Sequence, residues 1–138
     1  MRILFLATLI SLSSSAFASE LNAVESLLSL IQPGTYQGVY NEKKCTFTLD
    51  VDGETATGTL AKQHKSVTHT FTKDDVIRFN AQKGEFRSFQ VTRTEDPEKY
   101  STDEFRFVHN QTGAFVVIEQ IYINKRNHYR HIVECLLK

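Results

Sequence analysis

Hydrophobic and polar residues alternate along most of this chain, as they do in half-buried β-strands. The clearest case is residues 44–60, where Cys45, Phe47 and Leu49 alternate with threonine and aspartate before the pair Asp52-Gly53. The same alternation then resumes as far as Leu60. Because Asp-Gly suits the left-handed backbone of a tight turn, we predict a β-hairpin here.

Similar alternation predicts strands over residues 35–40, 65–72, 76–80, 85–93, 105–109, 114–123 and 128–137. A change of parity between Phe86 and Phe89 predicts a β-bulge near Arg87-Ser88. Residues 114–123 are apolar on both faces in their first half, and the polar stretch 94–103 is expected to be the longest loop. Eight or nine short strands at this spacing predict a small antiparallel up-and-down β-barrel, with a sandwich as the alternative.

The N-terminus has the pattern of a secretory signal peptide, with Arg2, a mainly apolar segment at residues 3–10 and Ala16-Phe17-Ala18. We expect residues 1–18 to be removed before Ser19, with an uncleaved membrane anchor as the alternative. Residues 19–138 are then one β-barrel domain, in a protein exported to the periplasm or secreted.

Residues 19–32 follow the spacing of an amphipathic helix, with Leu21, Val24, Leu28 and Ile31 on one side. Ser19 is a suitable N-cap, and Pro33-Gly34 ends the helix. We expect the helix to dock on the outside of the strand at residues 114–123. The alternative is a segment that binds a partner.

The two cysteines are Cys45 and Cys135, and export to an oxidising compartment predicts that they form a disulfide. A bridge that closes about 90 residues stabilises the fold by up to roughly 4 kcal/mol. The second and last strands of an up-and-down barrel lie close together where the sheet closes, so the bridge favours closure. Two free or metal-binding thiols are the alternative.

The chain has 138 residues, with 16 basic and 16 acidic side chains and a formal net charge of zero. No basic stripe is present, which argues against nucleic acid and anionic membranes as partners. No G-x-S-x-G motif or activated nucleophile is evident, so we do not expect an enzyme or a cofactor. The histidines and the acidic turn at Asp50, Asp52 and Glu54 lack the spacing of zinc or calcium sites.

Six polar residues interrupt strand faces that are otherwise apolar, and in a closed barrel they would converge on one cavity or its mouth. A few polar groups around an apolar pocket are typical of a small-ligand site. The alternative is that these residues lie at strand ends or pair with one another, for example Arg93 with Glu119. The predicted ligand-binding residues are His69, Arg93, His109, Glu119, Tyr129 and His131.

Gly34-Thr35-Tyr36, after a short helix and at the start of the first strand, resembles the G-x-W motif of lipocalin-type (calycin) barrels. The resemblance implies a helix that closes one end of the barrel and a cavity for a small, usually apolar ligand. We therefore expect a binding module for a small apolar or amphipathic ligand. The alternative is a protein–protein module, such as an inhibitor of a secreted hydrolase, with the helix or residues 94–103 as the contact element.

Overall fold

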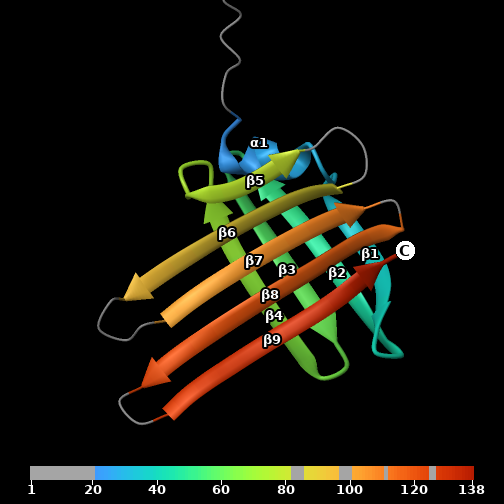
Figure 1. Cartoon of the computed structure of the whole chain (residues 1–138), viewed down its shortest axis with the longest axis vertical. Coiled ribbons are helices and arrows are strands. Elements are labelled where there is room, and N and C mark those ends of the chain that lie inside the picture. The colour runs from blue at the N-terminus through green and yellow to red at the C-terminus, as the bar shows by residue number, and fades with distance from the viewer. Residues whose placement is uncertain (1–20, 82–85, 97–100, 111, 125–126) are drawn as a thin grey trace, which may run out of the picture.

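The computed structural model describes residues 21–81, 86–96, 101–110, 112–124 and 127–138. The predicted signal peptide at residues 1–18 and its cleavage site lie outside these residues. The described part contains one short helix and nine strands (Figure 1). They are α1 (Ala23–Leu28), β1 (Gly34–Tyr40), β2 (Lys43–Asp52), β3 (Thr55–Lys62), β4 (Lys65–Thr72), β5 (Ile77–Ala81), β6 (Phe86–Asp96), β7 (Ser101–Asn110), β8 (Gly113–Asn124) and β9 (Asn127–Leu137).

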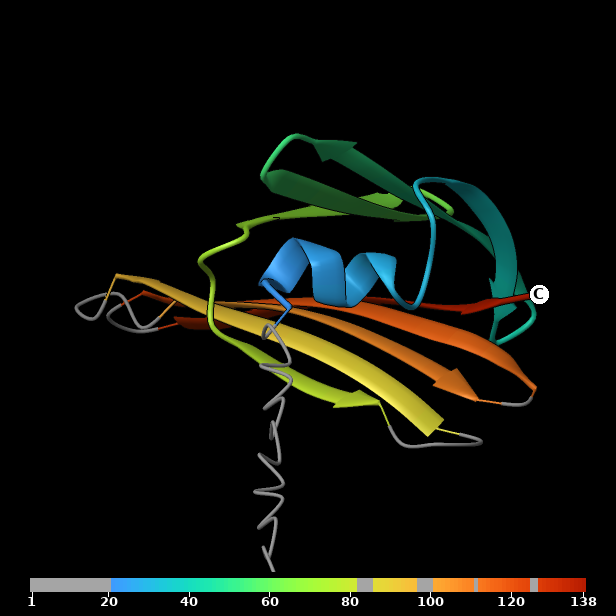
Figure 2. The ribbon, with the colours of Figure 1, turned by 90° about the horizontal axis from the view of Figure 1, so that it is seen from above.

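The strands form one antiparallel sheet in the order β4-β3-β2-β1-β9-β8-β7-β6-β5. Each strand pairs with its neighbour in the chain except at β4 and β5, which are the two edges of the sheet. The first and last strands, β1 and β9, also pair with each other, through Gly38 with Leu137 and Val39 with Leu136. The sheet is therefore open only between β4 and β5. The result is a half-barrel in which β1–β4 cross over β5–β9 (Figures 1 and 2). The predicted small antiparallel β-barrel fold, with one short helix and one disulfide, is confirmed.

The hairpin of β2 and β3 has the predicted alternation, with Phe47, Leu49, Ala56 and Leu60 buried in the core. Its turn is shifted by one residue from the prediction. Asp52 pairs with Thr55 across the ladder, so the loop consists of residues 53 and 54. Residue 53 is a glycine with φ of 58°, the left-handed conformation that such a turn needs.

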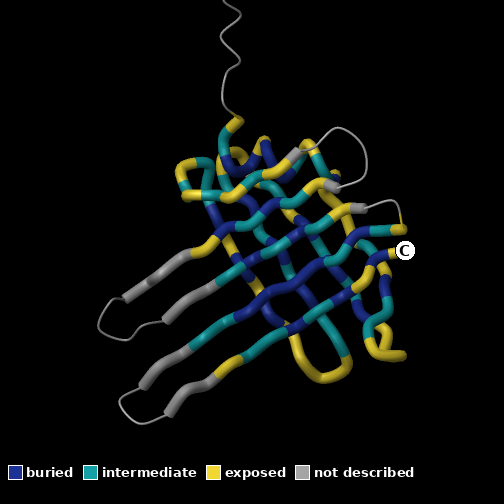
Figure 3. The backbone as a smooth tube through the Cα atoms, viewed as in Figure 1, coloured by how far each residue is buried: buried dark blue, intermediate teal, exposed yellow. Residues whose placement is uncertain are grey.

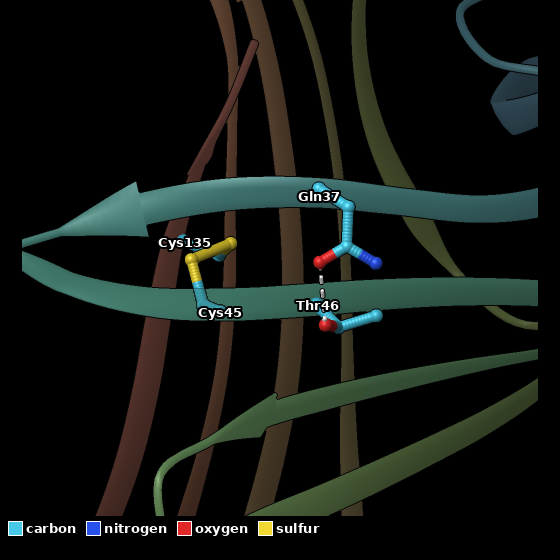
Figure 4. The surroundings of a disulfide bond; sticks show 4 residues. All are labelled: Gln37, Cys45, Thr46 and Cys135. Carbon is cyan, nitrogen blue, oxygen red and sulfur yellow. Dashed lines mark hydrogen bonds between the residues drawn. A yellow bond between two sulfur atoms is a disulfide. The ribbon is translucent and has the colours of Figure 1, made fainter.

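The disulfide joins Cys45 on β2 to Cys135 on β9, with Cα atoms 5.8 Å apart, and is confirmed (Figure 4). Gly38 on the intervening β1 pairs with Cys45 on one side and with Leu137 on the other. A Cβ atom at Gly38 would lie 2.6 Å from Cys135 Sγ and 2.4 Å from the Leu136 carbonyl oxygen. Position 38 therefore needs glycine, because the sulfur bridge and the β9 backbone occupy the space of a side chain.

Phenylalanine rings fill the space between the two layers of the half-barrel. Ring centroids are 5.4 Å apart for Phe71 and Phe89, 5.9 Å for Phe71 and Phe105, and 5.9 Å for Phe47 and Phe105. Figure 3 shows the buried positions gathered where the layers cross. In the described part of the chain, the core is therefore a packed aromatic interior.

The helix differs from the prediction in both its start and its position. Asn22 is the N-cap and forms a capping box with Glu25, whereas the predicted cap Ser19 lies outside the described residues. Helix α1 packs against β4 and β6, with Leu27 fully buried, rather than on the outside of β8. In Figure 2, α1 lies in the opening between β4 and β5, which we call the open seam, and its residues Ala23, Val24 and Leu27 belong to the core cluster.

Both ends of the polar stretch at residues 94–103 are strand rather than the predicted loop, and residues 97–100 lie outside the described part of the chain. Strand β6 continues to Asp96 and β7 begins at Ser101, with Thr94 paired to Thr102. Hydrogen bonding between adjacent strands decides the backbone here, although the sequence is polar. The register shifts between Thr94 and Asp96, and the predicted bulge at Arg87-Ser88 is replaced by regular pairing.

Candidate binding groove beside the helix

His69 is fully buried in the aromatic core rather than at a cavity. Its ring centroid lies 6.1 Å from that of Phe71 and 6.2 Å from that of Phe105. It shares the inward face of β4 with Val67 and Phe71, as the alternation predicted. His69 is thus a packed member of the core.

Glu119 lies on the face of β8 that points away from the core. Val116 and Ile118 belong to the core, so the alternation of a strand places Glu119 on the outer face. Its carboxylate pairs with Arg130 of β9, and this hydrogen bond and charge raise the pKa of the guanidinium. The inward placement of Glu119 was wrong because both faces of β8 are apolar in sequence, and Val117 on the outer face is also buried.

The outer face of β6–β9 carries polar side chains that pair with one another. Gln90 donates to Glu104 at 3.0 Å, and Arg106 Nε lies 2.7 Å from the same carboxylate. A hydrogen bond to Glu134, with the charge of that carboxylate, raises the pKa of Tyr40. Such partly exposed pairs contribute little stability, and they leave this face charged and solvated.

Three of the predicted site residues lie on one face of the sheet, beyond the core. The backbone register places Arg93, Asp103, Gln120 and His131 side by side across β6, β7, β8 and β9. The Gln120 amide donates to the Thr68 carbonyl of β4 at 3.3 Å, so this face points towards the crossing layer. Tyr129 is two residues before His131 on β9. The side chains of Arg93 and Tyr129 lie outside the described part of the structure.

The sixth predicted residue, His109, lines a groove of about 350 Å³ at the other end of the sheet. The groove lies between the residues that follow α1, the start of β1, the end of β7, the start of β8 and the end of β9. The Tyr36 hydroxyl donates to the Gln32 carbonyl at 2.7 Å and fixes one wall of the groove. The lining residues are Leu30, Ile31, Gln32, Tyr36, Phe107, His109, Gly113, Ala114, Leu137 and Lys138.

The groove combines apolar walls with a few polar groups at its rim. Phe107, Ala114 and Leu137 belong to the core cluster, so the lining is continuous with the packed interior. His109 and Lys138 are both exposed, and the ammonium group of Lys138 supplies positive charge. Such a surface can hold an apolar body and pair with an anionic head group.

Leu30 and Lys138 were missed as site residues because their position depends on closure of the fold. Leu30 follows helix α1, which the sequence analysis placed on the outside of β8. In the structure, α1 instead packs against β4 and β6, and Leu30 lines the groove. Lys138 reaches the groove only because β9 pairs with β1, with its backbone amide 3.4 Å from the Gln37 carbonyl. The one available signal was the parity of Phe107 and His109 on a single strand.

Comparison of the chain with protein-family models, with curated proteins and with solved structures gave no match. The structure adds two findings on its own. None of the helices in the described ranges is long and apolar enough to cross a bilayer. Within those same ranges, the His, Cys, Asp and Glu side chains do not gather into a group of three that could bind a metal ion.

Proposed function

We propose that this protein is an exported binding module for a small amphipathic ligand, which binds in the groove beside His109. The observation that carries the proposal is a groove of about 350 Å³ with apolar walls and a polar rim. This size lies within the usual range for small-ligand sites. Because phenylalanine rings fill the interior, the ligand lies at the mouth of the half-barrel rather than inside it.

The chemistry of the rim favours a ligand with an anionic head group. The ammonium group of the exposed Lys138 provides positive charge, while His109 and the amide of Gln32 provide hydrogen-bonding groups. The disulfide and the leader-like N-terminus support export, to the periplasm or to the exterior of the cell.

Fluorescence titration with an anionic and a neutral naphthylamine probe tests this proposal. We expect Leu30→Glu to raise the Kd of both probes about tenfold, a loss of about 1.4 kcal/mol, because it removes an apolar wall. Lys138→Glu should weaken the anionic probe only. Leu21→Glu is the matched control, because Leu21 lies before α1 and lines a different hollow.

The proposal fails if Leu30→Glu and Leu21→Glu bind both probes as the unchanged protein does. A second, independent test is native mass spectrometry of protein purified gently from the exported fraction, which identifies the class of the natural ligand. A discrete extra mass that is lost on denaturation is the expected result.

The filled interior also favours a second candidate, a protein–protein module such as an inhibitor of a secreted hydrolase. A scaffold whose core is fully packed offers its surfaces rather than a cavity. This candidate predicts a bare protein mass in the native spectrum and a protein partner that is retained on purification. Retention would then survive Leu30→Glu, whereas binding of a small ligand would not.

A further inference from the structure

The edge strand β5 leaves its inward side chains partly uncovered. Ile77 and Phe79 pair with Val91 and Phe89 of β6, and both β6 side chains are fully buried. Ile77 and Phe79 themselves are only half-buried, although they pack against the same core. The loss of burial therefore comes from the free side of β5, where the sheet ends.

A hollow of about 540 Å³ adjoins this edge and is lined by Leu21, Asn22, Ser26, Ile77 and Phe79. Leu21 is 47% exposed and Val76, which precedes β5, is 84% exposed. Only one other large hydrophobic side chain is exposed in the described ranges, Leu136 on β9. Exposed apolar side chains thus gather at one corner of the molecule, beside a strand that has room for a neighbour.

We propose that a second copy of this chain covers this corner, by antiparallel pairing of β5 with β5 of the other copy. A two-fold axis at Phe79 sets the two Phe79 residues opposite each other and each Ile77 opposite Ala81. Arg78 then faces Asn80 of the second copy, so no like charges meet. Such a contact uses the same surface on both copies and closes as a dimer.

The charge of the chain is compatible with this self-association. The full sequence has 16 basic and 16 acidic side chains, and removal of residues 1–18 takes away only Arg2, so two copies carry almost no net charge and repel each other little. The pairing also gives each exposed Arg78 an amide partner across the interface instead of water. The sequence of β5 is therefore compatible with pairing to β5 of a second copy.

Sedimentation velocity over a wide range of protein concentration tests the proposal. We expect a concentration-dependent doubling of mass in the unchanged protein. Asn80→Arg should raise the dissociation constant at least about tenfold, because it sets two pairs of arginine side chains against each other. Position 80 is exposed, so the change leaves the fold of the single copy intact.

A charge swap distinguishes this register from a general loss of association. Arg78→Glu combined with Asn80→Arg puts opposite charges across the interface, and we expect it to restore the dimer. Leu136→Glu, at the exposed apolar position on β9, is the control that should leave association unchanged. A single-copy mass at all concentrations overturns the proposal, as does a dimer that Asn80→Arg leaves unchanged.

Discussion

The two edge strands of the sheet differ in how completely they are covered. On β4, the inward side chains Val67, His69 and Phe71 are all buried. On β5, the inward side chains Ile77 and Phe79 are half-buried beside a hollow. The two edge strands are joined by only four residues, yet the inward side chains of one are buried and those of the other are partly exposed. The difference indicates that the burial of side chains on an edge strand depends on the elements that pack against it, rather than on the sequence of the strand.

The cover of β4 comes from side chains and backbone of other elements. The Asp75 carboxylate accepts from the Thr72 amide at 2.7 Å, and Gln120 donates to the Thr68 carbonyl. Residues an even number apart on an antiparallel strand direct their backbone groups to the same side, so these contacts satisfy one amide and one carbonyl on the free side of β4. The amide of Ala23 in α1 also donates to the carbonyl of Lys73 just after β4.

The largest expected difference is between the two phenylalanines at these edges. Phe71→Ala should lower the free energy of unfolding by about 3–5 kcal/mol, because it opens a cavity in the aromatic core. Phe79→Ala should cost less than half as much, because its ring is already partly in water. Urea denaturation of both variants measures this, and equal losses would contradict the difference between the edges.

The helix is the next test, because it covers the seam on the β4 side. Leu27→Ala removes a fully buried side chain of α1 and should cost about 2–4 kcal/mol. Leu28→Ala on the same helix is the control and should cost clearly less, since Leu28 is only partly buried. If thermal unfolding shows the two variants to be alike, α1 does not fill the seam.

The hydrogen bonds at the β4 edge should have a smaller effect. Gln120→Ala leaves the Thr68 carbonyl without this donor and should cost about 1 kcal/mol. Gln37→Ala removes an exposed side-chain contact to Thr46, 3.1 Å long, and should be near neutral. Chemical denaturation compares the two, and a neutral Gln120→Ala would show that the edge of β4 needs no such contact.

The smallest effect on folding is expected at Val76, beside the open edge. Val76→Ser should change the free energy of unfolding by less than about 0.5 kcal/mol, because the side chain is 84% exposed. The same change should still weaken association of two copies. A large loss of stability would mean that this corner is part of the monomer's core.

The sequence predicts the fold well where one face of each strand is apolar. The alternation in residues 44–60 and 65–72 was sufficient for β2, β3 and β4, and the cysteine count was sufficient for the disulfide. It fails for β8, because both faces of that strand are apolar and the orientation of Glu119 cannot be read from parity. It also fails for residues 94–96 and 101–103, because strand pairing there depends on the neighbouring strands and not on apolar content.

The candidate site was predictable only in part. His109 has the same parity as Phe107, and both residues line the groove. The backbone register places positions 93 and 131 on one face, as their alternation with the core residues indicates, and their role in binding stays a prediction. The groove itself was not predictable, since it depends on where α1 enters the open seam and on the pairing of β9 with β1.

Hydrogen–deuterium exchange of the backbone amides of β4 and β5, at low and high protein concentration, tests the difference between the edges most directly. We expect the Thr72 amide on the free side of β4, which donates to Asp75, to exchange slowly at both concentrations. The amides on the free side of β5 should exchange fast in dilute protein and slowly in concentrated protein. Uniformly slow exchange in both edges, or protection that grows with concentration elsewhere in the sheet, would contradict the account.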